Sequence, residues 1–397
     1  MSTVVEPTPA FRWDRLTAAS ALGYCLLVSA LSVGVVLGEL REQFDISGVI
    51  AALHGSTFGV GLLVCGVWGV AFVDRIGRRA ALQLSAAAML IGIVAFCTGP
   101  AWPITLAGTA LGGFGGALLV MVMPGLISDH HGENRAAAFA AANGAPGVAG
   151  VAFSLVIGFT LAAGASWRVS YLLLTGLITL ALAIVAWPVA MPASTAKVHF
   201  TLRHFRNRDV AVPYLFTVNA VLTEFTIGVW AVVYLKEVGN TSGGKASALG
   251  AVFGLTMFLG RMVMPTTMRL LGAATVSASF LLLTAGTLVM CLVPGLPAKV
   301  VGLAMVGWGG APLYPLNVDR LYRRADGQVD SVSLGAICAL ASGTAVVIGP
   351  LVMGVVADMV GLRWAILVVP VLAVIGAITQ WPRPPAPQRT AAPSIAR

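Results

Sequence analysis

Apolar residues are grouped along the chain into twelve runs, which are separated by charged residues, prolines or turn-forming residues. A helix that crosses a bilayer needs roughly 20 mostly apolar residues, and each run is about that long. The pattern therefore predicts an all-α integral membrane protein of twelve transmembrane helices. The predicted spans are 16–38, 49–73, 80–99, 102–126, 136–163, 167–187, 210–235, 246–269, 273–293, 297–318, 330–356 and 363–381.

A long polar connection divides the runs into two groups of six that resemble one another. Trp187-Pro188 closes the sixth run, and Trp381-Pro382 closes the twelfth run 194 residues later. Two parallel repeats of this kind are found in transporters whose halves are related by an axis along the membrane normal. We therefore expect an N-terminal six-helix bundle over 1–187, a cytoplasmic linker over 188–209, a C-terminal six-helix bundle over 210–381 and a cytoplasmic tail over 382–397.

The composition excludes an ordinary soluble enzyme, a coiled coil and a disordered chain. Hydrophobic residues make up 58% of the 397 positions and charged residues only 10%, whereas a soluble chain carries roughly 25% charged residues. The net charge of +9 indicates membrane topology rather than nucleic-acid binding. With both termini in the cytoplasm, inside segments hold 17 Lys and Arg residues and outside loops hold 6. We expect a multi-pass protein of the cell (plasma or inner) membrane with both termini cytoplasmic.

The connection between the second and third runs carries a recognisable motif. It reads Gly69-Val-Ala-Phe-Val-Asp74-Arg75-Ile-Gly77-Arg78-Arg79. This resembles the Gly-x-x-x-Asp-Arg-x-Gly-Arg-Arg signature of the major facilitator superfamily, which lies in the same cytoplasmic loop. Motif, span number and sidedness agree, so the resemblance covers essentially the whole chain. It implies the fold of that superfamily and a secondary transporter that works by alternating access.

The resemblance also implies a charge cluster that holds the halves together in the outward-open state, which we call the latch. Its expected residues are Gly69, Asp74, Arg75, Gly77, Arg78, Arg79 and Asp129. Asp129 ends the fourth run within reach of Arg78, and Gly77 permits a tight turn. Arg269 and Asp319, at nearly the same spacing in the second half, form a degraded copy. Ordinary positive-inside charge on short loops is the alternative for all of these residues.

Glu224 is the only acidic residue deep within a predicted span. Ionisable groups inside a membrane are costly and are usually functional, so Glu224 is the candidate proton-coupling residue. A neighbouring stripe on the same helix is the candidate lining of a solute cavity: Asn219, Thr223, Thr226 and Trp230. The alternative is that Glu224 pairs with a polar group of another helix. Arg261 either extends to the membrane surface or supports the second-half latch, with solute contact as a further alternative.

Three histidines lie near the ends of predicted spans. Glu39 ends the first span and His54 opens the second, so the two form a possible pH-sensitive outer gate or are ordinary interfacial residues. His130 and His131 are adjacent but have no cysteine nearby. We therefore expect no metal site there, and no cofactor elsewhere in the chain.

The resulting functional prediction is a transporter of a small solute that is coupled to protons and acts as a monomer among membrane lipids. Proton-driven drug exporters of the superfamily carry an arginine early in span four and a Gly-Pro-x-x-Gly-Gly element in span five. This chain lacks the arginine, and Pro146-Gly147 lies in only a loose analogue of the element. A sugar or another small polar metabolite is therefore favoured over a drug or lipophilic compound, with a lipid transporter of the same fold as a third possibility. A lone Glu224 does not make the convergent catalytic set of an enzyme, and the repeats argue against a channel.

Overall fold

The computed structural model describes residues 12–186, 202–325, 328–329 and 331–382, and every long regular element within them is a helix. The N-terminal half contains α1 (Arg15–Leu31), α2 (Val33–Phe44), α3 (Gly48–Val64), α4 (Val70–Ile76), α5 (Arg78–Thr98), α6 (Trp102–His131), α7 (Arg135–Ala162) and α8 (Trp167–Ala186). The C-terminal half contains α9 (Arg208–Glu237), α10 (Gly243–Leu271), α11 (Thr275–Leu292), α12 (Leu296–Gly310), α13 (Leu313–Arg324), α14 (Ser331–Val360), α15 (Leu362–Ala365) and α16 (Val368–Thr379). Most of the predicted linker, and the tail after residue 382, lie outside the described residues.

Eleven helical segments of the described chain are long and apolar enough to cross a membrane. One of them, Gly243–Leu292, is 50 residues long and contains both α10 and α11. The chain turns between these helices at Gly272, whose φ is +52°. Dividing the segment there gives twelve crossings, at the positions that the apolar runs predict. The expected all-α membrane fold is confirmed.

The helix boundaries follow from capping residues and glycine turns. Asp14, Ser47 and Ser242 cap α1, α3 and α10, because each side chain accepts a hydrogen bond from a backbone N–H in the first turn. Gly77 and Gly361 have φ values of +81° and +83°, which other residues adopt only with strain. These turns reverse the chain in one or a few residues and bring sequential spans side by side.

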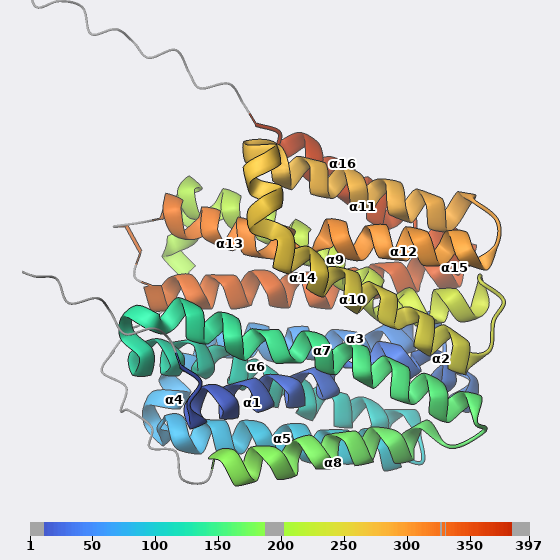
Figure 1. Ribbon diagram of the computed structural model, residues 1–397, viewed down its shortest axis with the longest axis horizontal. Helices are drawn as coiled ribbons and strands as arrows, with labels where there is room; N and C mark the ends of the chain where they lie inside the picture. The colour runs from blue at the N-terminus through green and yellow to red at the C-terminus, as the bar shows by residue number, and fades with distance from the viewer. Residues whose placement is uncertain (1–11, 187–201, 326–327, 330, 383–397) are drawn as a thin grey trace, which may run out of the picture.

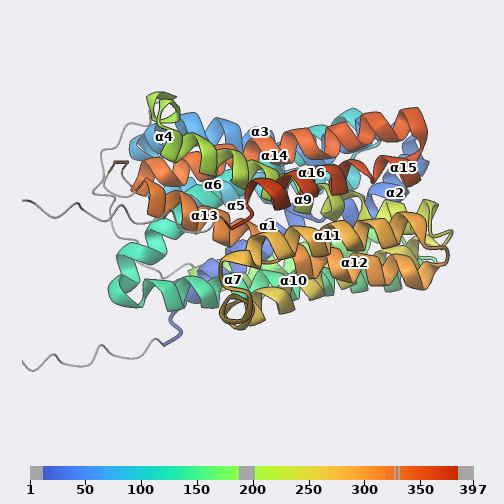
Figure 2. The same cartoon turned by 90° about the horizontal axis from the view of Figure 1, so that it is seen from above.

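The two halves lie side by side along the same long direction, with α1–α8 below α9–α16 in Figure 1 and all long helices roughly parallel in Figure 2. The start of α5 meets the end of α6 at one end of the bundle, where Arg78 and Asp129 are paired. We call this the Asp129 end. The opposite end, which we call the Glu39 end, holds the close of α2, the close of α9 and the start of α12.

Two pairs of long helices form much of the contact between the halves: α3 packs along α14, and α7 packs along α10. At both contacts glycines bring backbone against backbone. A Cβ on Gly354 would lie 2.7 Å from the carbonyl oxygen of Gly48, and a Cβ on Gly244 would lie 2.7 Å from that of Gly158. The two contacts are repeats of one another, because Gly48 and Gly244 are 196 residues apart and so are Gly158 and Gly354. Small residues are what such close helix packing in membranes requires.

Candidate functional site

The buried carboxylate of Glu224 has an arginine partner. Glu224 lies near the middle of α9, and its Oε1 is 3.3 Å from Nη2 of Arg261 on α10. The Glu224 side chain is 18% exposed and the Arg261 side chain 45% exposed, so the pair lies at the boundary between the packed bundle and accessible space. A charge pair that shields a carboxylate from lipid lowers the cost of placing it at membrane depth.

Only half of the Glu224 carboxylate is satisfied. Its Oε2 is buried and has no hydrogen-bond partner among the described residues. On the same side of α9, a Cβ on Gly310 would lie 3.7 Å from Cγ of Glu224, so α12 passes close to the carboxyl group. A buried acceptor without a donor is costly, whereas a protonated carboxyl has an O–H that can turn toward a neighbour. One oxygen of an ionised Glu224 would therefore lack a donor among the described residues.

The predicted cavity stripe, in contrast, faces the packed interior of the C-terminal half. Trp230 is 1% exposed, and its indole N–H donates to the carbonyl of Pro350 on α14. Thr223 and Thr226 are also buried, and their hydroxyls donate to backbone carbonyls of α9 itself. Asn219 donates to the carbonyl of Leu372. Thr223, Thr226 and Trp230 are thus packed in this conformation, whereas Asn219 is partly buried and its Oδ1 has no partner among the described residues. The assignment of these four residues to a solute cavity stays a prediction.

A network of charges joins the halves at the Glu39 end. Lys236 on α9 lies 2.5 Å from Glu39 and 2.8 Å from Glu42, both on α2. A second ion pair has its charges the other way round, with Arg41 on α2 and Glu237 on α9. We call these five residues the α2–α9 clamp. Every pair in the clamp connects one half to the other, so the clamp stabilises a conformation that is closed at this end.

A second link closes the same end beside the clamp. Asp358 near the end of α14 accepts hydrogen bonds from the backbone N–H groups of Gly48 and Val49, at 2.7 and 3.0 Å. These amides begin α3, where an acidic side chain is favourable. Because α3 and α14 belong to different halves, this cap also holds the Glu39 end together.

The structure does not bring the predicted outer gate together. Glu39 pairs with Lys236, whereas His54 is buried within the N-terminal half. One ring nitrogen of His54 lies 2.9 Å from the carbonyl oxygen of Ile50, and the other lies 2.9 Å from the hydroxyl of Thr105. The described contacts of His54 lie within its own half and none of them joins it to Glu39, so the outer gate stays a prediction.

The clamp itself was missed in the sequence, although a signal for it was present. Glu42 and Lys236 are 194 residues apart, the same offset that relates the two tryptophan-proline pairs. Positions related by a two-fold axis that runs through an interface lie near each other across it. Opposite charges at equivalent positions of the repeat, both near span ends, therefore indicate an ion pair between the halves.

One ion pair among the predicted latch residues is formed in this structure, and it lies within the N-terminal half. Nη1 of Arg78 lies 2.6 Å from Oδ2 of Asp129, as the sequence suggested. Asp74 is exposed and has no ion-pair partner among the described residues. Gly69 packs against the side chain of Met121, and it lies one position further from Asp74 than the signature requires.

The other predicted latch residues surround the α4–α5 turn, and the second-half copy does not reproduce the pairing of the first half. Gly77 makes the turn between α4 and α5, and Arg75 and Arg79 are exposed beside it. Asp319 pairs with Arg323 one turn further along α13, at 2.5 Å. Arg269, on the exposed end of α10, forms no described ion pair with Asp319. The copy therefore lacks the interhelical pair of the first half.

A substitution tests the role of Asp74. Asp74→Asn is expected to lower transport at least about tenfold, because the conformation that is open at the Glu39 end would lose a charge contact of roughly 1.4 kcal/mol. The folded protein should be retained, since Asp74 makes no described ion pair in the present conformation. Initial uptake rates and size-exclusion profiles measure the two quantities. Normal transport by this variant would reduce Asp74 to a loop charge.

The adjacent histidines acquire an acidic neighbour in the structure. Nε2 of His130 lies 2.7 Å from Oδ2 of Asp14, and Nε2 of His131 lies 3.7 Å from Oδ1. Burial alone would raise the pKa of the Asp14 carboxyl, but hydrogen bonds from Thr17 and His130 bring that pKa below its usual value. The three potential ligand atoms lie within 4.8 Å of one another, so Asp14, His130 and His131 form a group that could hold a metal ion. Sequence inspection missed Asp14 because it lies 116 residues from His130.

Comparison with known proteins agrees with the helical arrangement. A family model described as Major Facilitator Superfamily matches residues 17–274. No curated protein sequence matches the chain significantly. Solved structures of the same fold include a variant of the nucleoside transporter NupG, with a TM-score of 0.75 and 12% identity over 92% of this chain and 98% of that chain. A D-xylose-proton symporter gives a TM-score of 0.73 at 15% identity, over 92% and 97% of the two chains.

A third solved structure shares the fold. It is a bacterial homologue of the human lysosomal transporter Spinster, in an inward-facing and occupied conformation, with a TM-score of 0.68 at 15% identity over 92% of this chain and 94% of that chain. Identities this low establish a common fold and leave the solute open. The family model, by contrast, covers well over half of the sequence. The chain belongs to the Major Facilitator Superfamily.

Proposed function

We propose that this protein is a secondary active transporter that moves a small polar metabolite or sugar by alternating access and couples that movement to protons through Glu224. The observation that carries the proposal is the Glu224–Arg261 pair. It joins two helices of one half at mid-depth, where binding sites of such transporters lie. Membership of the superfamily supports the transporter, and the pair supports the coupling.

The coupling follows from the chemistry of the pair. An ionised Glu224 attracts Arg261 and holds α9 and α10 together at this level. Protonation of the carboxyl removes that attraction and frees the guanidinium to bind an acceptor on a solute. Proton and solute then affect the same arginine, which links the two binding events. Because Arg261 is the more exposed partner, it is the one that solute reaches first.

The proposed sidedness places the Asp129 end in the cytoplasm. Arg75, Arg78, Arg79 and Arg323 gather at that end, and positive residues favour the cytoplasmic side. The α2–α9 clamp then faces outward. With the clamp closed, the conformation is one in which solute exchanges with the cytoplasm.

Cysteine labelling tests this topology. Single cysteines in place of Asp45 and Lys245 should react with a membrane-impermeant maleimide in intact cells, whereas one in place of Arg323 should react only after permeabilisation. All five native cysteines are buried, which keeps the background low. Labelling with the opposite pattern would invert the orientation and move the clamp to the cytoplasmic side.

The experiment that tests the function combines a binding screen with exchange. Purified protein is screened for thermal stabilisation by sugars, nucleosides, amino acids, lipophilic cations and phospholipids, because a ligand that binds the native state raises its apparent stability. A stabilising compound is then tested for counterflow in proteoliposomes. Exchange of a polar metabolite supports the proposal. Stabilisation and exchange only with lipophilic cations or with phospholipids would replace it by an exporter or a lipid transporter.

A further inference from the structure

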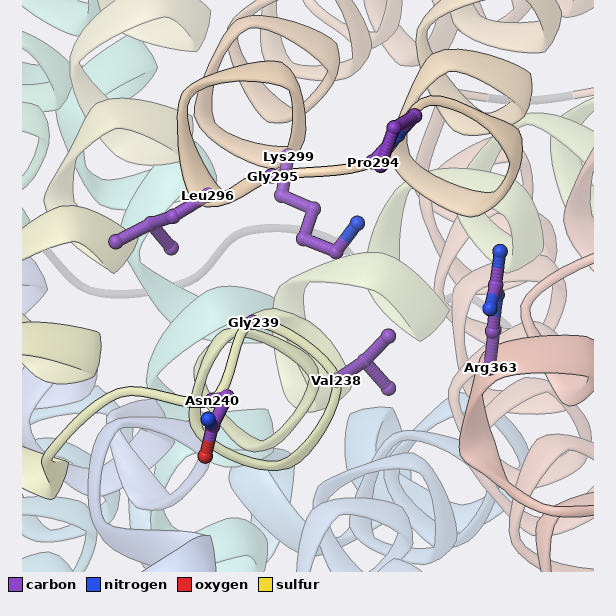
Figure 3. A pocket seen from close by; sticks show the side chains of 8 residues that line it. All are labelled: Val238, Gly239, Asn240, Pro294, Gly295, Leu296, Lys299 and Arg363. Atoms are coloured by element: carbon purple, nitrogen blue, oxygen red, sulfur yellow. The ribbon is translucent and has the colours of Figure 1, made fainter.

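A pocket lies in the C-terminal half at the Glu39 end, away from Glu224. Its volume is about 330 Å³, and it lies between the close of α9, the turn from α11 to α12 and the start of α15. Figure 3 shows Lys299 projecting between the α11–α12 turn and α9, with Arg363 across from it. The other lining residues are Val238, Gly239, Asn240, Pro294, Gly295 and Leu296.

Lys299 is unusual because it is buried without an acidic partner. The residue is 5% exposed, and lysines are rarely buried to this degree unless a carboxylate balances the charge. Its Nζ donates to the carbonyl oxygens of Met290 and Val293, at 3.3 and 3.2 Å. These two acceptors use two of the three ammonium hydrogens and provide no full negative charge.

Arg363 adds a second positive charge to the same pocket. Its Nε donates to the carbonyl oxygen of Cys291 at 3.3 Å, and its guanidinium lies over the ring of Trp364. Neither Lys299 nor Arg363 forms an ion pair with any described carboxylate. The nearest acidic groups along α9 belong to the α2–α9 clamp, where Glu237 is paired with Arg41. Two cations therefore face one cavity with their charge uncompensated.

We propose that this pocket binds an oxyanion, namely a phosphate or carboxylate group, between Lys299 and Arg363. The third ammonium hydrogen and the two terminal nitrogens of the guanidinium supply charge-assisted donors. The start of α12, where the N-cap residue Gly295 supplies no side-chain hydrogen bond, adds a favourable dipole at the same wall. The volume admits a single anionic group with part of the molecule that carries it.

The group can belong to a free anion or to a phospholipid, and the experiment separates these sources. Purified protein in a neutral detergent is titrated with inorganic phosphate, with succinate, and with phosphatidylglycerol against phosphatidylcholine, and the unfolding temperature is recorded. Phosphatidylglycerol retained on the protein is counted by native mass spectrometry. Stabilisation by phosphate or succinate indicates a free anion, and stabilisation only by phosphatidylglycerol indicates a headgroup.

Variants assign the effect to the pocket. Lys299→Gln and Arg363→Gln should each weaken binding at least about tenfold, since each removes one charged partner. Lys299→Arg keeps the positive charge while changing the contacts with the carbonyls of Met290 and Val293, and it should retain binding. Comparison with Lys299→Gln therefore separates loss of charge from loss of those contacts. Lys245→Gln is the matched control, because that lysine is exposed at the same end of the same half. Absence of stabilisation by phosphate, by succinate and by phosphatidylglycerol relative to phosphatidylcholine, or equal loss in Lys245→Gln, would overturn the proposal.

Discussion

Glu224→Gln is expected to abolish solute accumulation against a gradient while solute exchange continues. Glutamine keeps the size of the side chain and one acceptor oxygen but is fixed in a neutral form that cannot take up or release a proton. In proteoliposomes with an imposed pH difference, accumulation should fall at least about tenfold, because the coupling free energy between proton and solute is typically 1–3 kcal/mol. Counterflow without a pH difference should remain within about twofold of the unsubstituted rate.

Two further variants make this result specific. Asp209→Asn removes an exposed carboxylate from the first turn of the same helix and should leave both rates unchanged. Arg261→Gln alone leaves Glu224 without its partner, and the effect of combining it with Glu224→Gln should be smaller than the sum of the two single effects. Unimpaired accumulation by Glu224→Gln would make Glu224 structural and place the driving ion elsewhere.

Lys236→Glu is expected to open the Glu39 end and to shift the protein toward the opposite conformation. The substitution removes contacts with Glu39 and Glu42 and adds a like charge beside them. Exposed ion pairs contribute about 0.2–1 kcal/mol each. Lys236 is only 14% exposed, however, and repulsion adds to the loss. A change of roughly 2 kcal/mol moves the conformational equilibrium about thirtyfold.

The shift can be measured as a distance between spectroscopic labels on α2 and α9. The distance should increase in Lys236→Glu and return toward its original value in the exchanged variant Glu39→Lys with Lys236→Glu. Lys245→Glu adds the same charge change at the same end outside the clamp and is the control. An unchanged distance in Lys236→Glu would mean that the clamp does not determine which end is closed.

The fold was largely predictable because a bilayer requires long apolar helices, and these leave a strong signal in the sequence. The pairing of Arg78 with Asp129 was also predictable, since a family motif and helix ends bring them to one loop cluster. The pairing of Glu224 with Arg261 was not predictable from the sequence. It depends on the rotation of α9 relative to α10, and helical periodicity gives the faces of one helix without saying which neighbour each face meets.

The burial of polar side chains was also not predictable from the periodicity of a single helix. Thr223, Thr226 and Trp230 form a polar and aromatic stripe that resembles a cavity lining, but in the structure they satisfy backbone groups of α9 and α14. In a membrane bundle polar side chains serve both purposes. Asp14 joins His130 for a similar reason, because the contact is set by how α1 crosses α6.

The glycine contacts between the halves have a mechanical consequence. Where Gly48 meets Gly354 and Gly158 meets Gly244, backbone approaches backbone, and the side chains beside these contacts include the small ones of Ala52 and Ala248 together with Asp358. Tilting one half over the other at these points therefore displaces few side chains, apart from Asp358, which has to release the amides of Gly48 and Val49. Because the two contacts are symmetry-related, the halves can slide over one another in the same way at both of them. A large side chain at any one of the four glycines would wedge the halves apart on that side alone and tilt the axis about which they rock.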